Sequence, residues 1–159
     1  VSVMKELLYV CSIIGFVLLL VYTAYMRVKK GGPLKSLSET AYIAKQPTTF
    51  TLIMSLVAFL ITPQMIARSE GWWGMLGMLY FIGMLMVAAS PHYRKGEHAL
   101  HFAGARLAAV ASQFLILMRC WPAMLVWVLY LIYYIRVRKD NTLYAEACCM
   151  LAMMIYCLR

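Results

Sequence analysis

The run LLYVCSIIGFVLLLVYTAYM (residues 7–26) contains no charged residue and decides the class of fold. About 20 consecutive apolar residues are what an α-helix needs to cross the hydrocarbon core of a bilayer. The run is longer than the core of a cleavable signal peptide, which has about 7–15 residues, and it lacks a clear small-x-small cleavage site. It therefore predicts a membrane helix that stays in the protein.

The composition of the whole chain extends this prediction. Apolar residues make up 64% of the 159 residues and charged residues 13%, against about 45–50% and about 25% in soluble globular domains. A chain of this length cannot bury so much apolar surface away from water. Lipid is therefore expected to surround most of the protein. We expect an all-α integral membrane protein with a single transmembrane domain (1–159).

Six apolar segments, separated by short polar stretches, predict a bundle of six transmembrane helices with short loops. The first four are long enough to cross a bilayer, and tyrosines and arginines can extend the last two. Helices are expected because the alternating pattern of a transmembrane barrel is absent. The predicted helices span approximately 7–27, 49–67, 72–89, 98–118, 121–135 and 142–158.

The net charge of +9 is concentrated between the apolar segments. Charge in such places orients membrane helices and contacts lipid headgroups, so we expect membrane lipids as partners and no nucleic-acid binding. The stretches after the first, third and fifth segments carry more Lys and Arg than the stretches on the other side. The positive-inside rule therefore places both termini outside, in what we expect to be a bacterial cytoplasmic (inner) membrane.

Small residues in the fourth segment predict a close helix–helix contact. Gly104, Ala108 and Ser112 follow one another at intervals of four, the small-xxx-small pattern that lets two helix backbones approach closely. Gly83 lies in the third segment, which precedes the fourth in the chain. The pattern predicts packing, and it leaves open whether the protein forms a homo-oligomer or joins a partner subunit in the membrane.

All three histidines lie in SPHYRKGEHALHFAGAR (90–106), at the entrance to the fourth segment. On a helix, Glu97, His98 and His101 would lie close together, a spacing that could chelate a metal ion. No HExxH motif or further ligand accompanies them, and haem ligands on facing helices are missing, so we expect no metal and no cofactor. Two interpretations remain: interfacial histidines bonded to loops, or a polar site with a pH-responsive histidine.

Arg106 is the charged residue that most needs an explanation. It lies about 14 Å into the fourth segment at 1.5 Å per residue, where a charge costs at least about 2.5–3.5 kcal/mol. We expect it to face the bundle interior, on the helical face of Gln113, with Glu146 of the last segment as its counter-ion. It is either half of a structural clamp with Glu146 or an anchor for an anion or lipid headgroup.

The connection between the first two segments contains a capping-box spacing, Ser36-x-x-Glu39. In such a box Ser36 would cap a helix start while Glu39 reaches back to a free amide. Pro47 is expected to begin the next helix or to end the preceding one. One interpretation is a short amphipathic helix on the cytoplasmic surface. The other places Ser36, Ser38 and Glu39 in the mouth of the bundle as part of a polar site.

Two stretches together resemble a known family: PLKSLSETAY (33–42), and ASPHYRKGEHALHFAGA (89–105), which opens a helix with a histidine followed by small residues. They are similar to segments of the DRAM-like group of six-helix membrane proteins, which includes autophagy modulators, GPI-anchor lipid remodelling factors and uncharacterised bacterial relatives. Leu37 and Glu39 stand where that group has isoleucine and aspartate. The resemblance implies a role near membrane lipids and no particular reaction. It highlights Ser36, Ser38, Glu39 and His101 (or His98).

Three functions follow from these patterns. The first is binding or handling of a lipid or small ligand at a polar site near the cytoplasmic mouth of the bundle. The second is a non-enzymatic subunit or pore-forming homo-oligomer, whose charged residues only tie helices together. The third is a lipid-modifying enzyme with a histidine as general base, which the sequence favours less because no nucleophile is identifiable. The candidate ligand-binding residues are Glu39, Glu97, His98, His101, Arg106 and Glu146, with Ser36, Ser38 and Gln113 as weaker candidates.

Overall fold

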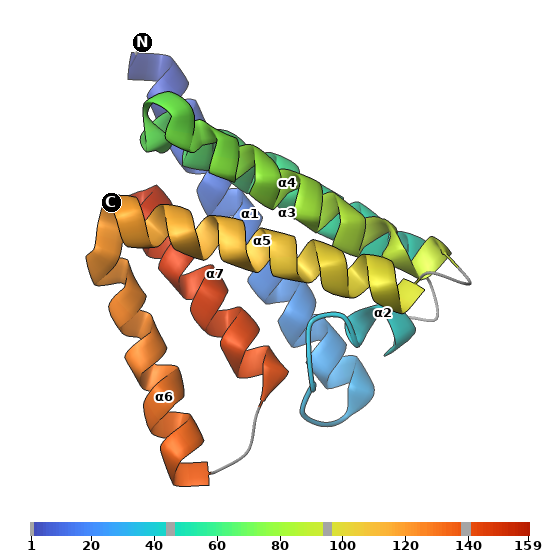
Figure 1. Cartoon of the computed structure of the whole chain (residues 1–159). Helices are drawn as coiled ribbons and strands as arrows, with labels where there is room; N and C mark the ends of the chain where they lie inside the picture. The colour runs from blue at the N-terminus through green and yellow to red at the C-terminus, as the bar shows by residue number, and fades with distance from the viewer. Residues whose placement is uncertain (1, 44–46, 94–96, 138–140) are drawn as a thin grey trace.

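The computed structural model describes residues 2–43, 47–93, 97–137 and 141–159. No strand occurs in these ranges, so the predicted all-α fold is confirmed (Figure 1). The elements, in chain order, are α1 (Ser2–Lys30), α2 (Thr40–Ile43), α3 (Pro47–Ser69), η1 (Gly71–Trp73), α4 (Gly74–Ala89), η2 (Ser90–His92), α5 (Glu97–Cys120), η3 (Trp121–Leu125), α6 (Val126–Val137) and α7 (Thr142–Leu158).

The six apolar segments correspond in order to α1, α3, α4, α5, α6 and α7. Four stretches are long and apolar enough to cross a membrane, and the fourth holds both α5 and α6, between which the chain turns back at η3 (Figure 1). α7, with 17 residues, is apolar but shorter than these spans. Six separate crossings therefore stay a prediction. The four stretches are Val3–Lys30, Pro47–Ser69, Gly71–His92 and His98–Val137.

Local chemistry sets where the helices begin and end. α1 ends where Gly31 takes a φ of 73°, and the Gly31 amide donates to the Arg27 carbonyl at 3.2 Å, a common glycine stop. Pro47 begins α3, as the sequence allowed, because the first turn of a helix does not need its amide hydrogen. Asn141 caps α7 by accepting a hydrogen bond from the Tyr144 amide at 3.3 Å.

α4 and α5 make the most extensive helix–helix contact in the described structure. A Cβ added to Gly83 would lie 2.6 Å from the Gly104 carbonyl oxygen and 2.6 Å from the Ala108 amide nitrogen. A Cβ added to Gly104 would lie 2.6 Å from the Gly83 carbonyl oxygen. The close approach predicted from the small residues of the fourth segment is therefore confirmed at this crossing.

Apolar side chains lie both inside and outside the bundle. Inside, the core joins residues of α1, α3, α4, α5 and α7, among them Met26, Ile61 and Leu115. Outside, Leu20 and Val110 leave 71% and 68% of their surface exposed. An extensive exposed apolar surface is typical of a protein that contacts lipid or other proteins.

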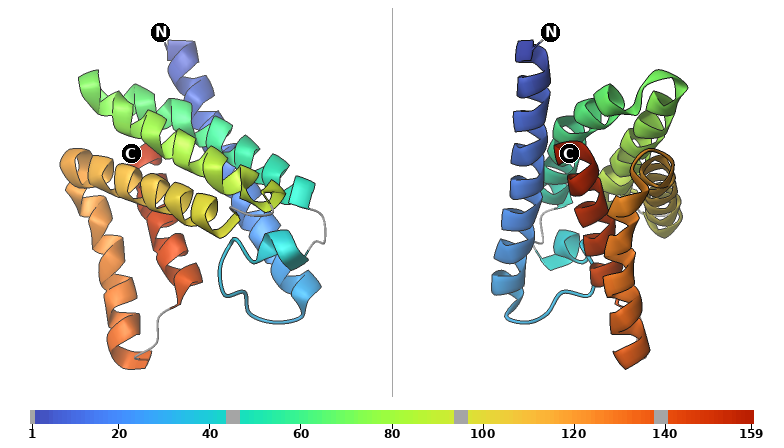
Figure 2. Two further views of the ribbon diagram at one scale, coloured as in Figure 1. Left: turned by 45° about the vertical axis from the view of Figure 1, so that its right-hand side comes forward. Right: turned by 90° about the vertical axis from the view of Figure 1, so that its left-hand side faces the viewer.

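Both termini lie toward one end of the bundle, and residues 31–43 lie at the other, here called the loop end (Figure 2). The predicted orientation, with the loop end in the cytoplasm, depends on positive charges between the helices. It stays a prediction, since half of those charges lie outside the described residues: Lys45, Arg94, Lys95, Arg138 and Lys139.

Candidate functional site

A cavity of about 700 Å³ lies at the loop end of the bundle. Its size falls within the range of about 300–1,000 Å³ that is usual for small-ligand sites. The 35–42 segment and residues of α3, α4, α5, α6 and α7 form its wall. Much of the wall is apolar, including Phe50, Met54, Met84 and Met153.

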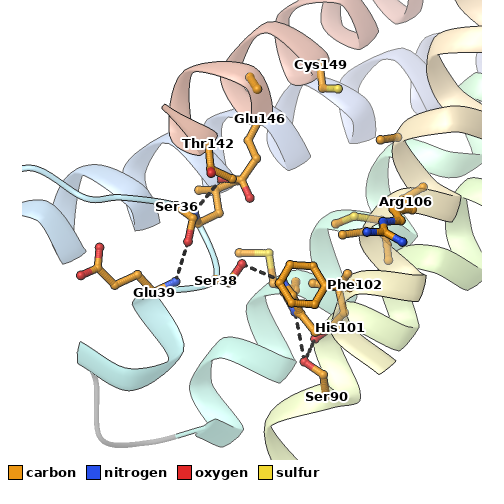
Figure 3. A pocket seen from close by; sticks show the side chains of 18 of the residues that line it. Ser36, Ser38, Glu39, Ser90, His101, Phe102, Arg106, Thr142, Glu146 and Cys149 are labelled. Carbon is orange, nitrogen blue, oxygen red and sulfur yellow. Dashed lines mark hydrogen bonds between the residues drawn. The ribbon is translucent and has the colours of Figure 1, made fainter. Parts of the chain in front are cut away.

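The ring of His101, on α5, lies between two serines from other parts of the chain (Figure 3). Its Nε2 is 2.8 Å from Ser38 Oγ, and its Nδ1 is 3.2 Å from Ser90 Oγ. The buried Ser90 hydroxyl already donates to the Val87 carbonyl at 2.8 Å. Ser90 Oγ therefore accepts from Nδ1–H, which leaves the Nε2 lone pair to accept the Ser38 hydroxyl hydrogen. This network assigns the tautomer of His101.

Glu146 ties the loop end to the start of α7. Its Oε2 accepts a hydrogen bond from the Leu37 amide at 2.7 Å. Close by, the Leu143 amide donates to the Lys35 carbonyl at 3.0 Å. The segment that carries Ser38 thus lies in the mouth of the bundle. This placement agrees with one of the two interpretations of the sequence. The alternative amphipathic surface helix does not form within 31–43, where α2 has only four residues.

Glu39 points away from His101 and toward α1 (Figure 3). Its Oε1 lies 2.6 Å from Lys30 Nζ, and its Oε2 accepts from the Lys35 amide at 2.7 Å. The Lys30 hydrogen bond, followed by that of the Lys35 amide, lowers the pKa of Glu39. Ser36 Oγ accepts from the Glu39 amide at 3.3 Å, and Glu39 reaches back to a backbone amide as predicted, although this is the amide of Lys35 and not of Ser36. Glu39 lines the cavity, but its carboxylate fastens the loop to α1 through these bonds.

The expected ion pair between Arg106 and Glu146 does not form. Neither of the two ion pairs among the described residues includes them, and Figure 3 shows them on separate walls of the cavity. Arg106 is exposed and lines the cavity. At 100° per residue it lies about 200° around α5 from Gly104 and Ala108, which face α4. The α4 contact therefore turns Arg106 away from the buried interior where we expected it.

The other candidates lie in different places. His98 also lines the cavity, where it is exposed and its ring lies 6.5 Å from that of Phe102, and the side chain of Glu97 lies outside the described structure. Gln113 is not among the residues of the cavity wall; its Oε1 accepts from Trp127 Nε1 at 2.9 Å. Within the described ranges, no group of three or more His, Cys, Asp or Glu residues could hold a metal ion.

Sequence reasoning missed two residues of the site, Tyr80 and Ser90. Tyr80 lies in the cavity wall, is 1% exposed, and its hydroxyl has no hydrogen-bond partner within the described part of the chain. Such a group costs about 1–3 kcal/mol unless something satisfies it. A tyrosine in an apolar segment gives no signal of this. Ser90 could have been suspected from its place beside the histidine cluster.

Comparison of the chain with protein-family models, with curated proteins and with solved structures gives no match. The resemblance to the DRAM-like group therefore stays a prediction, and the function has to be argued from the geometry of the site.

Proposed function

We propose that the chain is an integral membrane protein that binds an amphipathic, lipid-like ligand with an anionic head. The observation that carries this proposal is the cavity, which combines a largely apolar wall with polar groups on a few of its elements. Sites for small ligands usually have this composition, since the apolar wall supplies affinity and a few polar groups fix orientation. The apolar exterior and the four long apolar helices support a location in the membrane.

Arg106 supports an anionic head. Arg106 is one of the residues that line the cavity, and the described residues offer its guanidinium neither an ion pair nor a hydrogen bond. An arginine within a membrane segment is costly, so such residues are usually paired or used for function. Its planar group binds carboxylate and phosphate in a two-pronged geometry. The head of the ligand would lie at Arg106, and its chain would extend toward Met54, Met84 and Met153.

Replacing Arg106 with glutamine is expected to weaken binding of an anionic probe by about 10- to 100-fold. The reason is the loss of a charge-assisted hydrogen bond, which contributes about 1.5–3 kcal/mol. The measurement is a fluorescence titration of the purified protein in neutral detergent with dansyl-aminoundecanoic acid. The methyl ester of the same probe should bind wild type and Arg106→Gln alike, because it has no charge for Arg106 to recognise.

Arg136→Gln is the matched control. Arg136 is an exposed arginine on α6 that does not line the cavity, so its removal tests for general attraction between a basic protein and an anionic probe. Equal losses in the two variants, or equal binding of the acid by wild type and Arg106→Gln, would refute the role of Arg106.

A further inference from the structure

We infer that this cavity is a hydrolytic site for acyl esters, with Ser38 as the nucleophile and His101 as the general base. The inference rests on the proposed ligand site and assigns it a reaction. No nucleophile could be identified from the sequence because Ser38 and His101 are 63 residues apart, and only the fold brings them together.

Ser38 and His101 are in direct contact. Ser38 Oγ lies 2.8 Å from His101 Nε2, within the distance of about 2.6–3.2 Å expected for a nucleophile and its base. The hydrogen bond of Nδ1 to Ser90 fixes the tautomer, so that Nε2 is the nitrogen able to take the hydroxyl proton. Both Ser38 and His101 line the cavity, where a bound ligand can reach the serine oxygen.

Neighbouring groups hold both Ser38 and His101 in place. Ser90 acts as a positioning residue for the ring, since its 2.8 Å bond to Val87 fixes the hydroxyl that accepts from Nδ1. Ser38 directly follows Leu37, whose amide is bound by Glu146. A nucleophile and a base supported by neighbouring groups are what activation of a serine requires.

The reaction uses water as its only co-reactant. Ser38 Oγ attacks the carbonyl carbon of the ester while its proton moves to His101 Nε2. The bond from that carbon to the alcohol oxygen then breaks, and His101 returns the proton to the departing alcohol. Water next attacks the acyl-serine and gives a proton to His101, and the serine oxygen leaves and takes that proton back. The products are a carboxylic acid and an alcohol.

The wall of the cavity indicates the class of substrate. Met54, Met84 and Met153 offer an unbranched acyl chain a flexible apolar surface. Arg106 on the same wall would hold an anionic group of the alcohol part. We therefore assign esters of long-chain acids with anionic alcohols, as in acylated phosphate headgroups. Short-chain esters would leave the apolar wall unfilled.

The test is covalent labelling of the detergent-purified protein with a fluorophosphonate–rhodamine probe, with the adduct located by peptide mass spectrometry. An activated serine displaces fluoride from such a probe and forms a bond to phosphorus. Wild type should be labelled at Ser38, and Ser38→Ala should lose the label. His101→Gln should slow labelling at least about 100-fold, the usual minimum for loss of a general base. Ser55→Ala, a serine of α3 away from the cavity, should label at the wild-type rate.

A second measurement separates positioning by Ser90 from a merely structural role. With 4-nitrophenyl decanoate as substrate, Ser90→Ala should lower kcat about tenfold or more with little change in KM, and Ser90→Thr should restore most of it. The kcat/KM of the wild type should be higher for 4-nitrophenyl decanoate than for 4-nitrophenyl acetate. If Ser90→Ala lowers the melting temperature but does not lower kcat selectively over KM, Ser90 serves packing alone, and its role in positioning is overturned.

The outcomes also separate the two proposals. If wild type binds the dansyl acid but carries no fluorophosphonate on Ser38, the hydrolytic assignment is overturned and the binding site stands. A label on another serine likewise overturns it. If folded wild type neither binds the acid nor reacts at Ser38, both proposals fail.

Discussion

Gly104→Val is expected to prevent formation of the folded bundle, or to lower its melting temperature by more than about 6 °C. A Cβ at this position would lie 2.6 Å from the Gly83 carbonyl oxygen and 3.0 Å from the Val87 amide nitrogen. Backbone atoms cannot rotate away as a side chain can, so the helices would have to separate. Overpacking of a core costs about 1–3 kcal/mol and sometimes more, and a clash with backbone atoms is expected at the upper end of this range. At about 2–4 °C per kcal/mol in a domain of this size, a cost of about 3 kcal/mol lowers the melting temperature by about 6–12 °C.

Thermal unfolding followed by size-exclusion chromatography in detergent measures this effect. Gly32→Val is the matched control, because a Cβ at Gly32 meets no atom within 4 Å. It should melt within about 2 °C of wild type. A Gly104→Val protein that melts like the control would show that α4 and α5 do not cross as closely as described.

Ala109→Trp is expected to abolish ligand binding while the protein stays folded. Ala109 lies on α5 in the wall of the cavity and is only partly buried. An indole ring projecting from this position would fill space that the apolar chain of the ligand needs. We expect affinity for dansyl-aminoundecanoic acid to fall more than tenfold, equivalent to at least about 1.4 kcal/mol.

Val110→Trp controls for the added aromatic surface. Val110 is the next residue on the same helix, but it is 68% exposed and lies outside the cavity wall. Both variants should keep a cooperative melting transition, and only Ala109→Trp should lose binding. Equal affinity in the two variants would place the bound probe outside the cavity.

The helices could be predicted closely because their signals are local. Apolar runs set the six segments, and Pro47 marks a boundary through its own backbone preference. The crossing of α4 and α5 was foreseeable from Gly104 and Ala108, since only small residues let two backbones approach so closely. The number of membrane crossings could not be settled in this way, because α6 and α7 are short.

The candidate site was only partly predictable, because it depends on how helices rotate against one another. His101 and Ser38 were both candidates, yet nothing in the sequence says that their side chains meet at 2.8 Å. Arg106 was expected to pair with Glu146 only because of the depth at which each residue was predicted to lie in the membrane. The rotation of α5 set by the α4 contact turns Arg106 away, and Glu146 accepts the Leu37 amide instead. The pattern of side chains in a sequence does not show which backbone amide of a loop is free to donate a hydrogen bond.

The most direct test of the proposed ligand site is photocrosslinking with a fatty acid that carries a diazirine near the end of its chain. After irradiation of the purified protein, peptide mass spectrometry locates the adducts. We expect adducts on residues of the cavity wall, such as Met54, Met84 and Met153, and their loss when unlabelled fatty acid competes. Adducts confined to outward-facing residues such as Leu20 and Leu129, 71% and 60% exposed, would contradict it.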